Sequence, residues 1–247
     1  MPRMPAGGVT AAPPVARRLA GLDWAAVERA LDEWGWARTP PLLTPAECDE
    51  LIALYDVDAR FRGRVDMERH RFGRGEYKYF AEPLPPVVAA LRAHAYARLA
   101  PIAARWEAAL GRRVSYPDAL PAFLATCARR GQHKPTPLLL RYHEDGYNCL
   151  HQDLYGEVYF PLQLTCVLSR RGVDYTGGES VLVEQRPRAQ SRGGVVVLEQ
   201  GEGLFFPTRH RPARGARGTY RVGVRHGVSR IVSGQRYSLG IIFHNAA

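Results

Sequence analysis

Three residues in the second half of the chain have the side-chain types and spacing of a metal site. In His151-Gln152-Asp153 the imidazole and the carboxylate are two residues apart, so in an extended segment both project to the same face. His226, much further along the chain, supplies a second imidazole. Two imidazoles and one carboxylate on one side of a metal leave the other side open, which is typical of non-haem iron(II) oxygenases. We therefore predict that His151, Asp153 and His226 bind iron(II).

Arg236 and Ser238 strengthen this interpretation. A His-x-Asp pair alone is often a histidine beside an acidic turn, and arginine is abundant in this chain. Arg236 and Ser238, however, follow His226 on one face of an expected strand. A guanidinium binds a carboxylate through two hydrogen bonds, and a nearby hydroxyl adds another. This pair suits the distal carboxylate of 2-oxoglutarate, whose other end would chelate the iron.

The elements that must position these residues are strands. After about residue 136, short runs rich in Val, Leu, Phe and Tyr alternate with Gly, Arg and Pro turns, which predicts an antiparallel sandwich or jelly roll. The expected strands are 138–143, 158–169, 179–185, 194–199, 203–207, 219–225, 228–232 and 236–244. His226 lies between two of them. The predicted fold class is mainly β with N-terminal helices, a double-stranded β-helix (jelly roll) with helical support.

The first half of the chain predicts mainly helices. Thr44, Pro45 and Glu47 have the spacing of a capping box that starts a helix. Further helices are expected at about 23–34 and at 87–110, the latter interrupted near Pro101, and a strand is expected at 75–80. We expect residues 1–18, rich in Pro, Ala and Gly, to be disordered or loosely attached. Residues 19–247 should form one domain, with helical support at 19–135 and the jelly-roll core at 136–247.

The bulk composition is that of an ordinary globular protein. Of the 247 residues, 46% are hydrophobic and 23% are charged, which argues against disorder. No apolar run is long enough to cross a bilayer, and because the first residues lack the sustained apolar segment of a secretory signal, we expect none. The four cysteines lack CxxC pairing, and a carboxylate near Cys149 makes that thiol an unfavoured ligand. We expect a cytoplasmic monomer without a membrane partner.

The net charge of +10 favours a polyanionic partner. Nearly all of the positive charge is arginine, so a compositional bias is the alternative explanation. A phosphate-binding rim could form from His210, Arg214, Arg217, Arg221 and Arg225. A solvated charged loop explains the same residues equally well.

The chain resembles the Fe(II)/2-oxoglutarate oxygenase superfamily over most of residues 40–245. Tyr142, the Gly-Gly turn in 175–180 and the strand 203–206 are similar to the prolyl-hydroxylase-like branch. The His-Gln-Asp triplet and Arg236-Tyr-Ser-Leu239 resemble the AlkB-type DNA-repair dioxygenases. The stretch 72–85 is similar to a bacterial family described as oxygenases of damaged nucleic acid. Two AlkB-type residues are missing, because Ile242 replaces a second arginine and Leu140 replaces an asparagine.

This resemblance implies an oxidative enzyme that uses Fe(II), 2-oxoglutarate and O2, with Tyr142 contacting 2-oxoglutarate. The reaction would hydroxylate a C–H bond, and the first candidate is oxidative demethylation of alkylated nucleic acid in DNA repair. The alternatives are a hydroxylase of a protein side chain or small molecule, and a non-catalytic ligand-binding jelly roll.

Four more residues are candidates for contacting the substrate. Tyr77 and Tyr79 could stack on an extruded base, or they could belong to the core. Tyr147 and Asn148 precede the metal segment and could line the substrate entrance.

Overall fold

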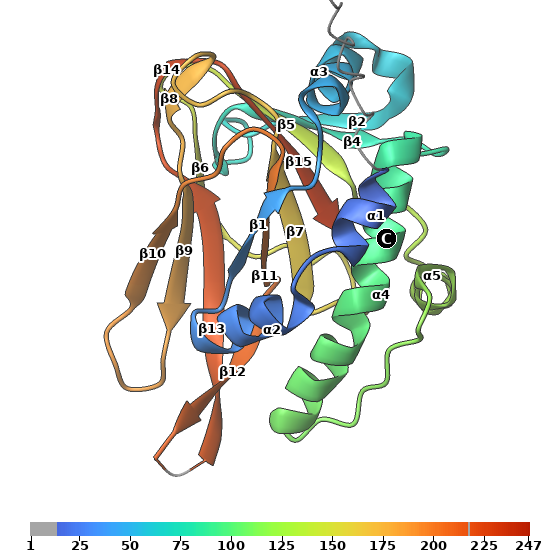
Figure 1. The fold of residues 1–247 in the computed structure, drawn as a ribbon, viewed down its shortest axis with the longest axis vertical. Helices are drawn as coiled ribbons and strands as arrows, with labels where there is room; N and C mark the ends of the chain where they lie inside the picture. Colours follow the sequence, from blue (N-terminus) through green and yellow to red (C-terminus); the bar gives the residue numbers. More distant parts are fainter. Residues whose placement is uncertain (1–13, 217) are drawn as a thin grey trace, which may run out of the picture.

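The computed structural model describes residues 14–216 and 218–247. Two antiparallel sheets face each other as the two walls of a jelly roll (Figure 1). The larger sheet has the strand order β1-β11-β7-β15-β5-β4-β2, and the smaller has β10-β9-β13-β6-β3, with β12 paired to β13. This arrangement confirms the predicted fold class.

Most of the strands expected after residue 136 overlap observed ones, but the strands at 147–151, 175–177 and 210–215 were not among those expected. The larger sheet consists of β1 (Ala37–Pro41), β2 (Phe61–Asp66), β4 (Glu76–Phe80), β5 (Leu138–Tyr142), β7 (Leu162–Val167), β11 (Glu202–Pro207) and β15 (Arg236–Ile242). The smaller sheet consists of β3 (Gly73–Arg74), β6 (Tyr147–His151), β9 (Ser180–Gln185), β10 (Arg192–Val196), β12 (His210–Gly215) and β13 (Gly218–Val228). A separate ribbon pairs β8 (Tyr175–Gly177) with β14 (Ile231–Gly234).

Helices cover the larger sheet on the side away from the smaller one (Figure 1). They are α1 (Val15–Ala20), α2 (Trp24–Glu33), α3 (Pro45–Ala53), α4 (Pro86–Ala109) and α5 (Leu120–Ala128), with short 3-10 turns η1 (Leu54–Asp56) and η2 (Asp58–Arg60). Helix α4 buries Leu91, Leu99 and Trp106 in the same core as Phe160 and Phe243. None of the described helices is long and apolar enough to span a membrane.

The first half of the chain differs from the expected helical support in one respect. Strand β4 confirms the strand expected at 75–80, but β1 and β2 were not expected. Together the three strands extend the larger sheet at both edges, so this half also builds the jelly roll. The start of α3 confirms the capping box, because Glu47 N–H donates to Thr44 Oγ1 at 3.2 Å and Thr44 N–H donates to Glu47 Oε2 at 2.8 Å.

Three local predictions were wrong. Helix α4 runs through Pro101 without a break, because the buried residues on either side hold it against the core and packing outweighs the lost hydrogen bond. Residues 15–18 belong to α1, whose Val15 and Leu19 are buried, whereas residues 1–13 of the expected loose segment lie outside the described residues. His226 lies inside the long strand β13 and not between two strands.

Candidate active site

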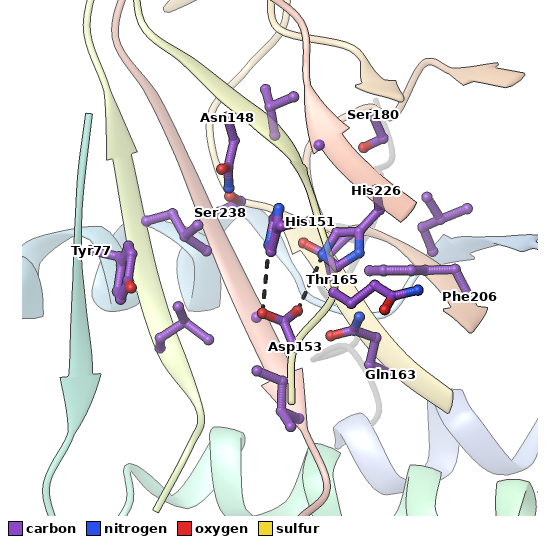
Figure 2. A pocket seen from close by; sticks show the side chains of 18 of the residues that line it. Tyr77, Asn148, His151, Asp153, Gln163, Thr165, Ser180, Phe206, His226 and Ser238 are labelled. Carbon is purple, nitrogen blue, oxygen red and sulfur yellow. Dashed lines mark ion pairs between the residues drawn. The ribbon is translucent and has the colours of Figure 1, made fainter. Parts of the chain in front are cut away.

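The side chains of His151, Asp153 and His226 converge on one point between the two sheets (Figure 2). His151 ends β6 and pairs directly with His226 of β13. His151 Nε2 lies 3.5 Å from Asp153 Oδ1, and His226 Nε2 lies 3.1 Å from Asp153 Oδ2. One ligand atom from each residue lies within 4.8 Å of the others. Two imidazole nitrogens and a carboxylate at this spacing fit Fe(II).

A β-bulge in β6 aims two side chains at this point. His226 pairs with His151, but Val228 pairs with Asn148, so β6 holds one residue more than β13 over the same stretch. The bulge lets Asn148 and His151 both line the cavity. The Cys149 carbonyl lies 2.8 Å from His151 Nδ1, which fixes the proton there and leaves Nε2 free for a metal. Gly227 is required opposite the bulge, because a Cβ would lie 2.5 Å from the Asn148 carbonyl oxygen.

The electrostatics of the cluster also suit a cation. Burial alone would raise the pKa of Asp153, but the hydrogen bonds and charges of the two histidines hold it well below its usual range. Burial alone would lower the pKa of His151, but the hydrogen bond and charge of Asp153 outweigh it and raise that pKa. Burial and the neighbouring His151 lower the pKa of His226. The cluster therefore presents an ionised carboxylate and two imidazoles, of which His151 keeps its proton up to a higher pH than His226.

We expect metal affinity to rise with pH through the neutral range. Because the pKa of His151 is raised, its proton competes with the metal up to a higher pH than an ordinary histidine would allow, whereas Asp153 and His226 need no proton change. Fe(II) binding should therefore release a proton from His151 at pH values below its raised pKa, and the apparent affinity should fall as the pH drops through that pKa. Anaerobic calorimetry in buffers of different ionisation enthalpy measures this. An affinity and a proton release that do not change as the pH is lowered would contradict the assignment.

Tyr155 is a contact of the cluster that the sequence did not indicate. Its hydroxyl donates a 2.8 Å hydrogen bond to Asp153 Oδ1, and its ring packs against Tyr79 and His244. On the other side, the Gln152 side-chain amide donates to the backbone carbonyls of Arg209 and Val224 at 3.1 and 2.8 Å. These bonds hold the segment after β6 in place, although it has no strand partner of its own.

Replacing Tyr155 with phenylalanine is expected to weaken metal binding about 10- to 100-fold, the usual effect of losing an outer-shell partner of a ligand. The ring would keep its packing, so the melting temperature should change little. Anaerobic Fe(II) titration measures the affinity. The matched control is Tyr116→Phe, in an aromatic cluster away from Asp153. Equal Fe(II) affinities in the two variants would show that the Tyr155 hydroxyl does not support the metal ligand.

Arg236 occupies the same cavity from β15 and forms no ion pair with an acidic residue of the described chain, although its charge helps to lower the pKa of the nearby Glu179. Its side chain is buried, at 2% exposure, and Nη1 donates to Ser238 Oγ at 3.1 Å. Within the described residues no carboxylate lies at ion-pair distance from it, and Nε has no hydrogen-bond partner. An unpaired buried charge is costly. This guanidinium therefore fits the distal carboxylate of 2-oxoglutarate as the missing partner.

The residues around Arg236 leave room for its side chain. Tyr142 is fully buried, with its ring centroid 5.9 Å from the guanidinium carbon, and its hydroxyl accepts a 3.3 Å hydrogen bond from Asn148. Gly178, in the Gly-Gly turn, has φ +66, and a Cβ there would lie 2.8 Å from Arg236 Cδ. The turn thus needs glycine both for its conformation and for the arginine.

The expected substrate residues are divided between the cavity and its surroundings. The cavity has a volume of about 300 Å³, and Tyr77 and Asn148 line it together with the ligands, Arg236, Ser238 and Tyr142. Tyr79 packs behind its wall against Tyr155. Tyr147 is exposed outside it. His210, expected in a loop, lies in β12 and does not line the cavity.

Further lining residues come from strands that sequence reasoning treated as core. Gln163 and Thr165 of β7 and Phe206 of β11 point into the cavity (Figure 2). Gln163 is 3% exposed and its amide nitrogen has no partner among the described residues. The signal was present in the sequence, because Gln163 and Thr165 are alternate polar residues in an otherwise apolar strand.

Comparison with known proteins agrees with this geometry. Residues 75–246 match the family Oxygenase-NA, described as "Oxygenase, catalysing oxidative methylation of damaged DNA". The chain is 52% identical over 185 residues to the uncharacterized protein Rv2227 of Mycobacterium tuberculosis, which covers 75% of this chain and 78% of that protein.

Solved structures share the fold at low identity. A Pseudomonas putida prolyl-4-hydroxylase aligns with a TM-score of 0.53 and 15% identity, covering 91% of this chain and 99% of that one. A 2OG-Fe(II) oxygenase family oxidoreductase from Burkholderia pseudomallei aligns with a TM-score of 0.53 and 17% identity, covering 92% and 93%. The chain therefore belongs to the Oxygenase-NA family of oxygenases, and it shares its fold with these solved structures.

Proposed function

We propose that this chain is an Fe(II)- and 2-oxoglutarate-dependent dioxygenase that oxidises an alkyl group on a nucleic-acid base. His151, Asp153 and His226 would hold Fe(II), and Arg236, Ser238 and Tyr142 would hold 2-oxoglutarate. The observation that carries the proposal is the shared cavity. The open side of the ligand cluster and an unpaired, buried guanidinium face the same space. A dicarboxylate can therefore reach both at once, and the remaining volume is left for a substrate.

Bound Fe(II) and 2-oxoglutarate would supply the activation of O2. The residues of this chain bind and orient the reactants. Arg236 and Ser238 hold the distal carboxylate, Tyr155 and Gln152 keep Asp153 in place, and apolar residues of β5, β7 and β11 exclude water. One O2 and one 2-oxoglutarate would convert R–CH3 to R–CH2OH with release of succinate and CO2. On a base nitrogen the hydroxymethyl group then leaves as formaldehyde and the nitrogen regains its hydrogen.

Two observations favour a base as the substrate. The family is described as acting on damaged DNA, and the lining includes Tyr77 and Phe206, whose rings suit a planar group, beside the unpartnered amide of Gln163. An amide both donates and accepts hydrogen bonds, as the edge of a base requires. The alternative, hydroxylation of a protein side chain or small molecule, would use the same iron chemistry, and only the substrate distinguishes it.

The test is a screen of N-methylated oligonucleotides, single- and double-stranded, with Fe(II) and 2-oxoglutarate supplied. We expect a methylated strand to increase succinate release above the rate measured without substrate, and the extra succinate to equal the formaldehyde released. The proposal would be contradicted if none of the methylated strands increased succinate release. Stimulation by a peptide or metabolite instead, with a mass increase of one oxygen, would establish the alternative.

A further inference from the structure

Two exposed apolar side chains line the cavity, and two more lie near them in the chain without lining it. Phe72 is 47% exposed and Leu154 is 37% exposed, and both line the cavity. Tyr147 and Leu150 of β6 are also exposed, at 42% and 40%. These four come from one short region, formed by β6, its continuation and the residue before β3. Exposed apolar groups gathered at the entrance of a buried site indicate a surface that a ligand covers.

Phe72 is held rigidly at this entrance. The His70 ring stacks on it, with centroids 5.4 Å apart and planes at 20°. Its backbone carbonyl accepts the Cys149 N–H at 2.8 Å, and its N–H donates to the Met67 carbonyl at 2.9 Å. Met67 is itself fully buried. The loop therefore presents an aromatic face beside the cavity at little cost in side-chain ordering.

On the other side of β6, the outer face of the smaller sheet carries arginines without acidic partners. Arg221 and Arg225 of β13 alternate with the inward residues Val224 and His226, so they point outward, and both are exposed. Arg209 is exposed just before β12. Among the described residues none of the three has an ion-pair partner, whereas exposed arginines such as Arg105 and Arg170 are paired. We call Arg209, Arg221 and Arg225 the arginine ridge.

The field at the ridge is positive. His210 is adjacent to it in β12, opposite Gly223 of β13. Burial and then the charges of Arg209, Arg221 and Arg112 lower the pKa of His210 to about 4. The ridge is joined to the cavity through Gln152, which lines the cavity and donates to the Arg209 carbonyl. A bound anion would therefore find positive charge that no carboxylate of the described chain neutralises.

We propose that Phe72 and the arginine ridge form the binding surface for a single strand of nucleic acid, with one base in the cavity, a neighbouring base stacked on Phe72 and the phosphates on the ridge. The proposal rests on the proposed function. Strand β6 separates β3 from β13, and the pairing of Cys149 with Phe72 and of His151 with His226 puts Phe72 nearly level with Gly227. At the usual strand spacing and rise, the backbone of Phe72 is about 12 Å from that of Arg225 and about 22 Å from that of Arg221, which corresponds to about three and about six phosphates along a stacked strand. Aromatic stacking together with a basic track is the usual mode of single-strand binding.

The test measures fluorescence anisotropy of an unmodified oligothymidylate of about 12 nucleotides with the full chain, Mn(II) and 2-oxoglutarate. Phe72→Ala should weaken binding about 5- to 150-fold through the loss of one stacked base. Arg221→Gln and Arg225→Gln should each reduce the slope of log affinity against log salt by about 0.7. Arg98→Gln, an exposed arginine on α4 with no ion pair in the described structure, should leave affinity and slope unchanged.

The outcomes separate this surface from the proposed function. The strand could bind and the Phe72 and ridge variants could lose affinity while no alkylated strand stimulates succinate release. That result would contradict the proposed function and support the binding surface. Alkylated strands could instead be turned over while the Phe72 and ridge variants keep the affinity and salt dependence of Arg98→Gln. That result would support the proposed function and contradict the binding surface. An acidic peptide of equal charge that binds as tightly and loses affinity in the same variants would overturn the assignment to nucleic acid.

Discussion

Replacing Asp153 with alanine is expected to abolish iron binding and turnover while the fold remains intact. Asp153 is the only carboxylate in the three-residue cluster, and both of its oxygens face a histidine. Losing an outer-shell partner of a ligand costs about 10- to 100-fold in metal affinity, so losing the ligand itself should cost more. Anaerobic Fe(II) titration and succinate release measure the two effects.

The matched control for this experiment is Asp118→Ala, the same substitution at an exposed position outside the cavity. It should bind Fe(II) and release succinate at the wild-type level. Asp153→Glu should retain part of the affinity if the cluster tolerates a displaced carboxylate. An Asp153→Ala protein that binds Fe(II) as tightly as the control would show that the metal lies elsewhere.

The parts of the site that the sequence predicted are those determined by strand periodicity. His151 and Asp153 are two residues apart, as are Arg236 and Ser238, and in each pair both side chains line the cavity. Alternation requires only that a segment be extended. The apolar runs around these residues also identify the strands that form the walls, which is why the jelly roll was predictable.

The residues that the sequence did not reveal depend on contacts between distant elements. The bulge in β6 becomes visible only when Asn148 is paired with Val228, and nothing in the residues of β6 marks it. The hydrogen bond from Tyr155 to Asp153 requires the segment after β6 to turn back toward the metal cluster. The continuous helix α4 likewise depends on packing that outweighs the preference of Pro101.

Replacing Arg236 with glutamine is expected to weaken 2-oxoglutarate binding about 30- to 5,000-fold, because removing one partner of a buried, hydrogen-bonded charge pair costs about 2–5 kcal/mol. Fe(II) affinity should stay at the wild-type level, since Arg236 does not touch the ligand cluster. The 2-oxoglutarate affinity of Arg236→Lys should lie between those of the wild type and Arg236→Gln, because an ammonium keeps the charge but cannot bind a carboxylate through a planar fork. Calorimetric titration of 2-oxoglutarate into the protein with Mn(II) measures the affinity.

Thermal unfolding provides the control that separates binding from damage to the fold. Without 2-oxoglutarate, wild-type Arg236 is a buried charge that forms no ion pair among the described residues, so its removal should not lower the melting temperature and should raise it if the desolvation cost exceeds the lost contacts. At 100 times its dissociation constant, 2-oxoglutarate should stabilise the wild type by about 2.7 kcal/mol, and it should stabilise Arg236→Gln far less at the same concentration. If both proteins are stabilised equally, the co-substrate does not bind Arg236, and the role proposed for this side of the cavity is wrong.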